Sequence, residues 1–140
     1  AFWINAYNFF TLDTIVRHLP VESMKDLGWK KREHVIGGQK FTLDEIEHKI
    51  IRPMNEPRIH FALNCASVSC PPLRKEIYTQ EKLIAQLTDQ VELSFLNPLH
   101  IRIEDDELYV TRLFKWFDDD FEVKPYGKRE NFIKKFARKL

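Results

Sequence analysis

Cysteine and glycine are both scarce in this chain of 140 residues, which contains two Cys and four Gly. Two cysteines are too few for the disulfide framework of a small secreted domain, and the few glycines exclude collagen-like and low-complexity sequences. No uninterrupted apolar run reaches the roughly 18 residues that a membrane span requires, so no transmembrane segment is predicted. Charge of one sign is lacking too, because 22 Lys and Arg stand against 21 Asp and Glu. The balance gives no argument for nucleic acid, and no such partner is predicted.

Aromatic residues are abundant, with 11 Phe, 4 Tyr and 3 Trp, and they predict a well-filled core. A chain of this length buries about two-thirds of the surface that its unfolded form exposes, so its core requires neither a metal nor a disulfide. We expect residues 1–140 to form a single domain. The first ten residues are typical of a helix interior, so we also expect an N-terminally incomplete piece of a longer protein. The sequence does not reveal the cell compartment or the oligomeric state.

The N-terminal residues 1–19 are predicted to form a helix that is apolar on nearly every side, which is typical of a helix at the centre of its domain. Asn5 and Asn8 lie one turn apart on one face of this helix. Buried amides need hydrogen-bond partners. The two residues are therefore candidates either for a structural hydrogen-bond network or for the lining of a site.

The other elements follow from turn signals and hydrophobic periodicity. Thr42 and Glu45 form a capping-box pattern that predicts the start of a helix over about 43–52. The further predictions are hairpins at 33–41 and 101–110, a strand at 58–64, helices at about 80–96 and 128–140, and a short helical turn at 113–117. The mixture predicts an α+β fold, with a small antiparallel sheet packed with a buried N-terminal helix and several amphipathic helices.

The segment from His60 to Pro72 is the candidate site, because a predicted strand enters a loop rich in Cys, Ser and Asn. Cysteine is the best nucleophile of this set, since a few per cent of a free thiol is ionised near neutral pH. A neighbouring imidazolium or helix N-terminus increases the thiolate fraction. We predict Cys65 as the nucleophile, with Cys70 as the second choice.

Spacing favours His48 as the base. In an extended strand His60 and Cys65 would lie roughly 16 Å apart and on opposite faces, at ~3.3 Å per residue, so His60 is not expected to be the direct base. His48 has Asp44 four residues earlier on the same helix face and Glu47 beside it. The hypothesis is a cysteine-dependent hydrolase or acyl-transfer domain in which Asp44 or Glu47 orients His48.

Other interpretations of the same residues stay open. The cysteines and histidines are zinc-ligand types, but no recognised spacing joins them, and neither a metal nor another cofactor is predicted. Cys65 and Cys70 could instead cycle between dithiol and disulfide. A further alternative is a non-catalytic interaction or scaffold domain, in which the cysteines and a buried His60 form a structural lock and the residues of the capped helix are an ordinary solvated face.

The candidate site residues fall into two sets. The predicted catalytic residues are Cys65, His48, Asp44, Glu47 and Cys70, and the predicted binding residues are Asn5, Asn8, His60, Asn64 and Ser69. The expected partner is a small-molecule, peptide or protein substrate whose identity the sequence does not give.

Four stretches carry a resemblance to a known family. They are AFWINAYN at 1–8, LDEIEH at 43–48, the run from Arg58 to Pro72, and LFKWF followed by DF at 113–121. In this order they resemble the family named domain of unknown function 547. The family has no established chemistry, so the resemblance implies a pocket rather than a reaction. Its members resemble parts of secreted bacterial proteins and of larger eukaryotic proteins, some with glutaredoxin-like modules, which hints at thiol chemistry.

The resemblance also implies a set of motif residues. Carried onto this sequence they are Asn5, Asn8, Glu47, His48, His60, Cys65, Ser69 and Cys70. Two positions depart from the expected pattern, because Asn64 stands where many relatives are expected to have an aliphatic residue and Ala66 where Gly is expected. The second departure bears on an oxyanion hole built from the backbone after Cys65. A distant likeness to papain-like and transglutaminase-like enzymes is an analogy of fold alone.

Overall fold

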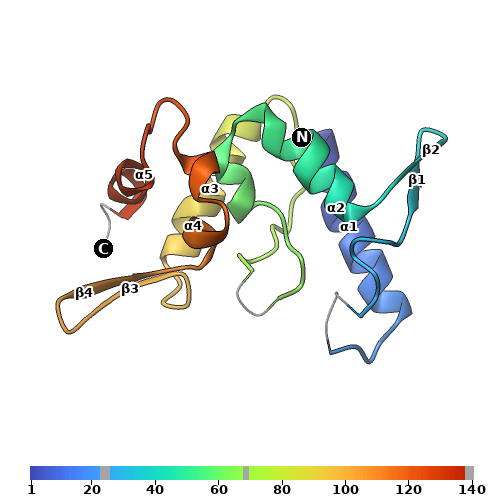
Figure 1. Ribbon diagram of the computed structural model, residues 1–140, viewed down its shortest axis with the longest axis horizontal. Helices are drawn as coiled ribbons and strands as arrows, with labels where there is room; N and C mark the ends of the chain where they lie inside the picture. Colours follow the sequence, from blue (N-terminus) through green and yellow to red (C-terminus); the bar gives the residue numbers. More distant parts are fainter. Residues whose placement is uncertain (23–25, 68–69, 138–140) are drawn as a thin grey trace.

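The computed structural model describes residues 1–22, 26–67 and 70–137 (Figure 1). Helices dominate it, and the single turns of 3-10 or π-helix are labelled η. In chain order the elements are α1 (Phe2–Arg17), β1 (His34–Ile36), β2 (Gln39–Phe41), α2 (Leu43–Glu45), η1 (Ile46–Ile51), η2 (Arg52–Met54), η3 (Pro57–Phe61), α3 (Leu83–Phe95), β3 (Ile101–Glu104), β4 (Glu107–Val110), α4 (Leu113–Trp116), η4 (Asp118–Phe121) and α5 (Arg129–Phe136). The predicted α+β class is confirmed.

Both predicted hairpins are present, and each is a separate antiparallel pair. His34 pairs with Phe41 in the first hairpin, and Ile101 pairs with Val110 in the second. Figure 1 shows the two hairpins at opposite ends of the molecule. The turn between β1 and β2 has Gly37 at φ 57° and Gly38 at φ 81°, the left-handed backbone that the Gly-Gly pair predicts.

The capping box at Thr42 is confirmed. The Thr42 hydroxyl accepts a hydrogen bond from the Glu45 backbone N–H at 3.1 Å, and Glu45 Oε2 accepts one from the Thr42 N–H at 3.1 Å. The helix that starts here widens at once into the π-helical turn η1 and ends at Asn55, which has a left-handed φ of 55°. π-Helical turns occur frequently at functional sites, and η1 contains Glu47 and His48.

The strand predicted at 58–64 is wrong, because a 3-10 helix, η3, occupies Pro57–Phe61. Pro57 supplies a φ that suits the first helical position, and the Glu56 carboxylate caps the turn by accepting from the Arg58 N–H at 3.1 Å. The consecutive residues Ile59, His60 and Phe61 are all buried. The argument that excluded His60 as a base depended on an extended strand, and it no longer holds.

Two hydrophobic clusters form the core, with η3 and α3 between them. We call the first the aliphatic core, and its buried members are Ile4, Tyr7, Leu43, Ile46, Ile51, Ile59, Ala62, Leu63, Tyr78 and Leu87. We call the second the aromatic core, and its buried members are Phe61, Val91, Phe95, Ile101, Leu113, Phe114, Phe121, Tyr126, Phe132, Ile133 and Phe136. Two residues of η3 on either side of His60 belong to different cores, because Ile59 packs in the aliphatic core and Phe61 in the aromatic core.

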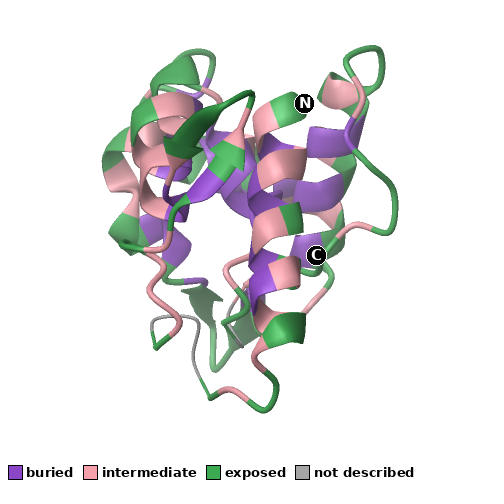
Figure 2. Cartoon of the chain, turned by 90° about the vertical axis from the view of Figure 1, so that its right-hand side faces the viewer, coloured by how far each residue is buried: buried purple, intermediate pink, exposed green. Residues whose placement is uncertain are grey.

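Helix α1 is buried along one side only. In Figure 2 the helices carry buried residues on one side and exposed residues on the other. Tyr7 and Asn8 are on the buried side of α1, whereas Phe9 and Val16 are 59% and 67% exposed. The buried side contacts η1 and the end of η3, and it brings Tyr7 toward the candidate site.

Candidate functional site

We call the segment from Asn64 to Pro71 the cysteine loop, of which residues 64–67 and 70–71 are described. The side chains of two asparagines, Asn8 and Asn64, hold it in shape through hydrogen bonds. Asn8 Oδ1 accepts from the Asn64 backbone N–H at 2.9 Å, and Asn8 Nδ2 donates to the Ala62 carbonyl at 2.9 Å. Within the loop, Asn64 Nδ2 donates to the Pro71 carbonyl at 2.9 Å and Asn64 Oδ1 accepts from the Ala66 N–H at 2.8 Å. Ala66 adopts a left-handed φ of 60°. Asn8 thus ties the start of the loop to α1, and Asn64 ties the start of the loop to its end.

The two cysteines lie side by side in this loop, and neither forms a disulfide in the part of the chain that the structure describes. Their sulfur atoms are 2.8 Å apart, and Cys70 Sγ also accepts from the Cys65 N–H at 3.2 Å. The hydrogen bond with Cys65, together with burial, raises the pKa of the Cys70 thiol. Since the thiolate is the nucleophilic form, this environment disfavours Cys70 as a nucleophile at neutral pH.

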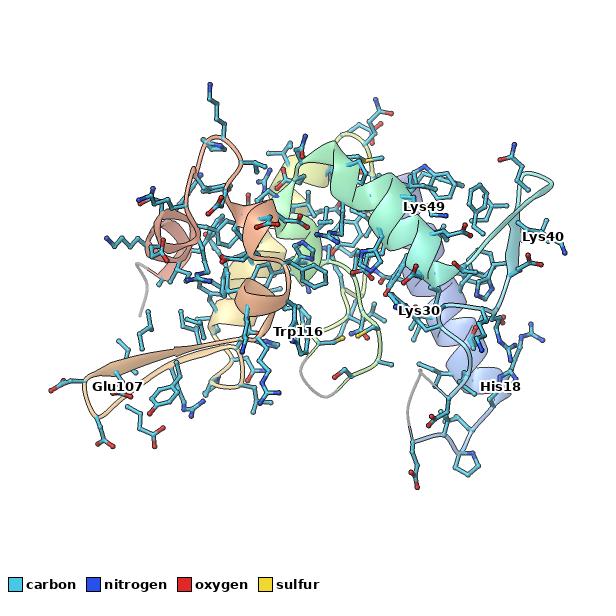
Figure 3. The ribbon with its side chains drawn as sticks, in the orientation of Figure 1. His18, Lys30, Lys40, Lys49, Glu107 and Trp116 are labelled. Atoms are coloured by element: carbon cyan, nitrogen blue, oxygen red, sulfur yellow. The ribbon has the colours of Figure 1, made fainter. Side chains whose placement is uncertain are left out.

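A cavity of about 230 Å³ opens beside the loop, and apolar side chains form most of its wall. Its lining residues are Tyr7, Trp29, Glu47, His48, His60, Leu63, Cys65, Ala66, Ser67, Cys70, Pro71, Leu113, Trp116 and Phe117. The lining comes from α1, η1, η3, the cysteine loop and α4, so it joins segments that are far apart in the sequence. Figure 3 shows Trp116 at the end of α4, beside that loop.

Arg52 connects the two histidines of the cavity, because it contacts His48 directly and His60 through the carboxylate of Asp120. Its Nε and Nη2 donate to Asp120 Oδ2 and Oδ1 at 2.7 and 2.9 Å, and its Nη1 lies 2.9 Å from His48 Nδ1. Asp120 Oδ2 is also 2.7 Å from His60 Nε2. Burial opposes ionisation of this carboxyl, but the hydrogen bonds from His60 and Arg52 hold the pKa of Asp120 well below its usual range. Asp120 is therefore an anion at neutral pH.

These contacts decide where each imidazole carries its proton. A guanidinium can only donate, so His48 Nδ1 accepts from Arg52 and neutral His48 carries its proton on Nε2. The Asp120 carboxylate can only accept, so His60 donates from Nε2 and keeps a lone pair on Nδ1. Burial lowers the pKa of both His48 and His60, which keeps both rings neutral near pH 7. His60 thus retains a basic nitrogen, whereas His48 retains an N–H donor.

Glu47 is a buried carboxyl group in the wall of the same cavity. Its side chain accepts at Oε2 from the Tyr7 hydroxyl at 3.0 Å, and that hydroxyl accepts from Trp29 Nε1 at 3.1 Å. Burial raises the pKa of Glu47 to about 7, and the nearby charge of Cys65 acts in the same direction. The group is therefore partly protonated at neutral pH, unlike Asp120.

The structure brings five of the predicted site residues to one cavity. They are Cys65, Cys70, His48, Glu47 and His60. Asp44 is not one of the lining residues, and its Oδ1 lies 3.7 Å from His48 Nε2 and 3.8 Å from Lys30 Nζ, which is longer than a hydrogen bond.

The other predicted residues do not line the cavity, or they lie outside the residues that the structure describes. Asn5 pairs with the backbone of Tyr78, through Nδ2 to the carbonyl at 2.8 Å and through Oδ1 to the N–H at 2.9 Å. Asn8 and Asn64 support the loop through the bonds given above. Ser69 lies outside the described residues.

Sequence reasoning missed Arg52, Asp120, Tyr7 and Trp29. Helical spacing could have found Arg52, which follows His48 by four residues. Tyr7 is part of the first family-like stretch but is apolar enough to be assigned to the core. Asp120 stands in a run of acids 60 residues from His60, and no local pattern links the two.

The described residues contain neither a metal-binding group of side chains nor a membrane-spanning helix. Within residues 1–22, 26–67 and 70–137, no three His, Cys, Asp or Glu side chains are grouped so that they could hold a metal ion. The zinc interpretation gains no support from this part of the chain. In the same part, none of the helices combines the length and the apolar character needed to cross a bilayer.

A family model described as "Protein of unknown function, DUF547" matches residues 1–95. The match covers more than half of the chain, which therefore belongs to this family. It includes the first three family-like stretches and ends before the fourth at 113–121. No curated protein and no solved structure matches the chain.

Proposed function

We propose that this DUF547 protein is a cysteine-dependent hydrolase or acyl-transfer enzyme with Cys65 as its nucleophile. One observation carries the proposal. The cavity that Cys65 lines is also lined by His60, whose Nε2 is held 2.7 Å from the Asp120 carboxylate. A nucleophile, an imidazole and an orienting carboxylate are the three parts that activate a thiol.

The proposal changes the base that the sequence favours. Arg52 occupies the Nδ1 lone pair of His48, so that ring has no basic nitrogen left in its neutral form. His60 keeps the Nδ1 lone pair because Asp120 holds the proton on Nε2. We therefore assign the base to His60 and orientation of its ring to Asp120. Phe117 stacks on the His60 ring at a centroid distance of 4.0 Å and restricts it further.

In the proposed reaction, His60 Nδ1 takes the proton from Cys65 Sγ. The thiolate attacks a carbonyl carbon of the substrate, and an alcohol or amine leaves with a proton as the thioester forms. The Nε2–H of His48 is a donor for the carbonyl oxygen as that atom becomes negative. Water, or a second acceptor, then releases the acyl group from the sulfur.

The test uses p-nitrophenyl esters of short, apolar acids and detects the acyl group on the intact protein by mass spectrometry. We expect an adduct on the wild type and on Cys70→Ser, and none on Cys65→Ser, with the two serine variants as matched controls for each other. The adduct should be removed by hydroxylamine, as a thioester is. An adduct that persists in Cys65→Ser, or no adduct with any ester, contradicts the proposal.

A second candidate function is thiol–disulfide exchange, and the sulfur–sulfur distance of 2.8 Å favours it. Cys65 would attack a substrate disulfide, and Cys70 would resolve the mixed disulfide, so that the substrate gains two electrons and the pair becomes a disulfide. Cys70→Ser separates the two candidates. The variant keeps acyl transfer, but in a redox protein it traps the mixed disulfide with oxidised glutathione.

A further inference from the structure

We propose that Glu47 is the general acid of this site, which donates its proton to the leaving group of an ester or amide with an apolar acyl part. The inference rests on the proposed function and extends it to the substrate class. His60 and Asp120 account for activation of the thiol, but they leave unexplained why a carboxyl group only 7% exposed lines the same cavity.

The hydrogen bonds around Glu47 point in one direction. An indole N–H can only donate, so Trp29 donates to the Tyr7 oxygen and the Tyr7 hydroxyl proton goes to Glu47 Oε2. The carbonyl oxygen of a neutral carboxyl group is a better acceptor than its hydroxyl oxygen. Because Oε2 accepts from Tyr7, we assign the proton of neutral Glu47 to Oε1, and the Trp29–Tyr7 chain favours that arrangement.

The charged groups around Glu47 come from several elements. Tyr7 of α1 donates to it and favours ionisation, and the positive charge of Arg52 in η2 acts in the same direction. The negative charges of Cys65 in the loop and Asp44 in α2 oppose ionisation. Burial opposes it more strongly and outweighs Tyr7 and Arg52, so the pKa rises to about 7.

A comparison of the two carboxyl groups in the network supports different roles. Asp120 accepts two hydrogen bonds from a guanidinium and one from an imidazole, so it stays ionised and orients His60. Glu47 accepts from one neutral hydroxyl and is more deeply buried. Carboxyl groups whose environments separate their pKa values in this way usually differ in their acid–base roles, and the one with the raised pKa is the acid.

Each proton in the proposed step has a donor and an acceptor in the site. His60 Nδ1 removes the Cys65 proton, a C–S bond forms, and the carbonyl electron pair moves to oxygen. When the intermediate collapses, the bond from carbon to the leaving group breaks and the leaving group takes the proton from Glu47 Oε1. In deacylation the Glu47 carboxylate takes a proton from the attacking water, and the departing sulfur regains its proton from His60.

This role defines a class of substrates. A p-nitrophenolate leaves readily as an anion and gains little from an acid, whereas an alkoxide or amine must be protonated as it leaves. A built-in acid therefore indicates alkyl esters or amides as the natural substrates. Leu63, Pro71, Leu113 and Trp116 give the cavity wall its apolar character, which suits an apolar acyl group.

The experiment compares Glu47→Gln with the wild type on two esters of one acyl group, a p-nitrophenyl ester and an ethyl ester. Only the acylation of Cys65 is timed, in single turnovers. We expect Glu47→Gln to acylate with the p-nitrophenyl ester at nearly the wild-type rate and to lose about 100-fold with the ethyl ester. The matched control is Glu81→Gln, an exposed position, which should change neither rate.

The outcomes separate the two proposals. If the wild type is not acylated by either ester, the proposed function fails. If Glu47→Gln slows both esters equally, or slows neither, the acid role fails while the nucleophile stands. The p-nitrophenyl rate of the variant is also the check that its site has folded.

The pH profile gives an independent readout. The wild-type rate with the ethyl ester should fall as pH rises through about 7, because Glu47 loses its proton, and this limb should vanish in Glu47→Gln. Tyr7→Phe removes the donor that favours ionisation, so the limb should move to higher pH. An unchanged limb in both variants would overturn the assignment.

Discussion

The region that the family model matches and the region beyond it contribute different things to the cavity. Residues 1–95 supply the proposed nucleophile, base and acid, which are Cys65, His60 and Glu47, and amide-to-backbone hydrogen bonds such as those of Asn8 hold this region. Residues 96–137 supply part of the wall and the Asp120 carboxylate that contacts His60, and packed aromatic rings hold this region. The family-matched region thus contains the proposed reacting groups, while the group that orients the proposed base comes from outside.

The difference teaches that the contact between His60 and Asp120 depends on packing between the two regions. Asp120 is followed directly by Phe121, a fully buried member of the aromatic core. Phe61 of η3, next to His60, belongs to the same core. The aromatic core therefore sets the position of His60 and of its carboxylate partner together.

The largest effect is expected from breaking the aromatic core. Phe132 is fully buried, and its ring lies 5.0 Å from that of Phe121 and 5.9 Å from that of Phe61. Phe132→Ala should lower the free energy of unfolding by about 3–5 kcal/mol in urea denaturation, because a large cavity is left. Val16→Ala, at an exposed position of α1, is the control and should change it by less than about 0.5 kcal/mol. If the two variants are equally stable, the aromatic core does not hold the second region.

The next effect is the pH dependence of stability, to which the carboxyl groups of Glu47 and Asp120 contribute in opposite directions. The pKa of Glu47 rises on folding from 4.5 to about 7, so the folded state binds the extra proton in this range and stability falls as pH rises through it. The loss is roughly 3 kcal/mol at 1.36 kcal/mol per pKa unit. Asp120 behaves oppositely, since its lowered pKa makes stability fall as pH drops through the acidic range.

Denaturation of the wild type and of Glu47→Gln at a series of pH values checks this prediction. The stability of the wild type relative to the variant should decline between pH 4.5 and about 7, because the histidines with lowered pKa values titrate in both proteins and cancel in the difference. The acid-side loss, to which Asp120 contributes, should remain in both. A difference that stays constant over this range would contradict the raised pKa of Glu47.

The third prediction concerns the Asp120 carboxylate, which residues 96–137 supply to the proposed base, His60. Asp120→Asn keeps the side-chain volume but replaces an acceptor of the His60 N–H by an amide that can also donate. Acylation of Cys65 should slow by about 100-fold because His60 no longer keeps its lone pair on Nδ1. Asp119→Asn, the exposed neighbour, is the matched control. Equal rates in both variants would contradict the orienting role of Asp120.

The sequence predicted the parts of this molecule that depend on neighbouring residues. The Thr42 capping box, both hairpins and the cysteine loop are local patterns, and a few adjacent residues determine them. The strand at 58–64 was wrong because its run of apolar residues suits a buried 3-10 turn as well as a strand. Pro57 and the Glu56 cap favoured the turn.

The site followed the same division. Cys65, Cys70, His48, His60 and Glu47 were predicted from residue type and from the family resemblance, and all five line one cavity. Asp120 was not found, because its partnership with His60 depends on packing between regions 60 residues apart. The tautomers of the histidines could not be predicted either, since they follow from Arg52 and Asp120 together.

The smallest effect on stability is expected from removing a side-chain amide of α1. The comparison of two such variants tells whether an amide stabilises only the fold or also the position of Cys65. Asn8→Ala leaves the Ala62 carbonyl and the Asn64 N–H without their bonds to α1, so the free energy of unfolding should fall by about 1–3 kcal/mol. Asn5→Ala is the matched control, because Asn5 makes the same pair of bonds to Tyr78 instead of the loop. Both should lose similar stability, but only Asn8→Ala should also change the rate at which iodoacetamide labels Cys65. If both variants leave that rate unchanged, the loop keeps its shape without α1, and the family-matched region does not depend on its amides for the position of the thiol.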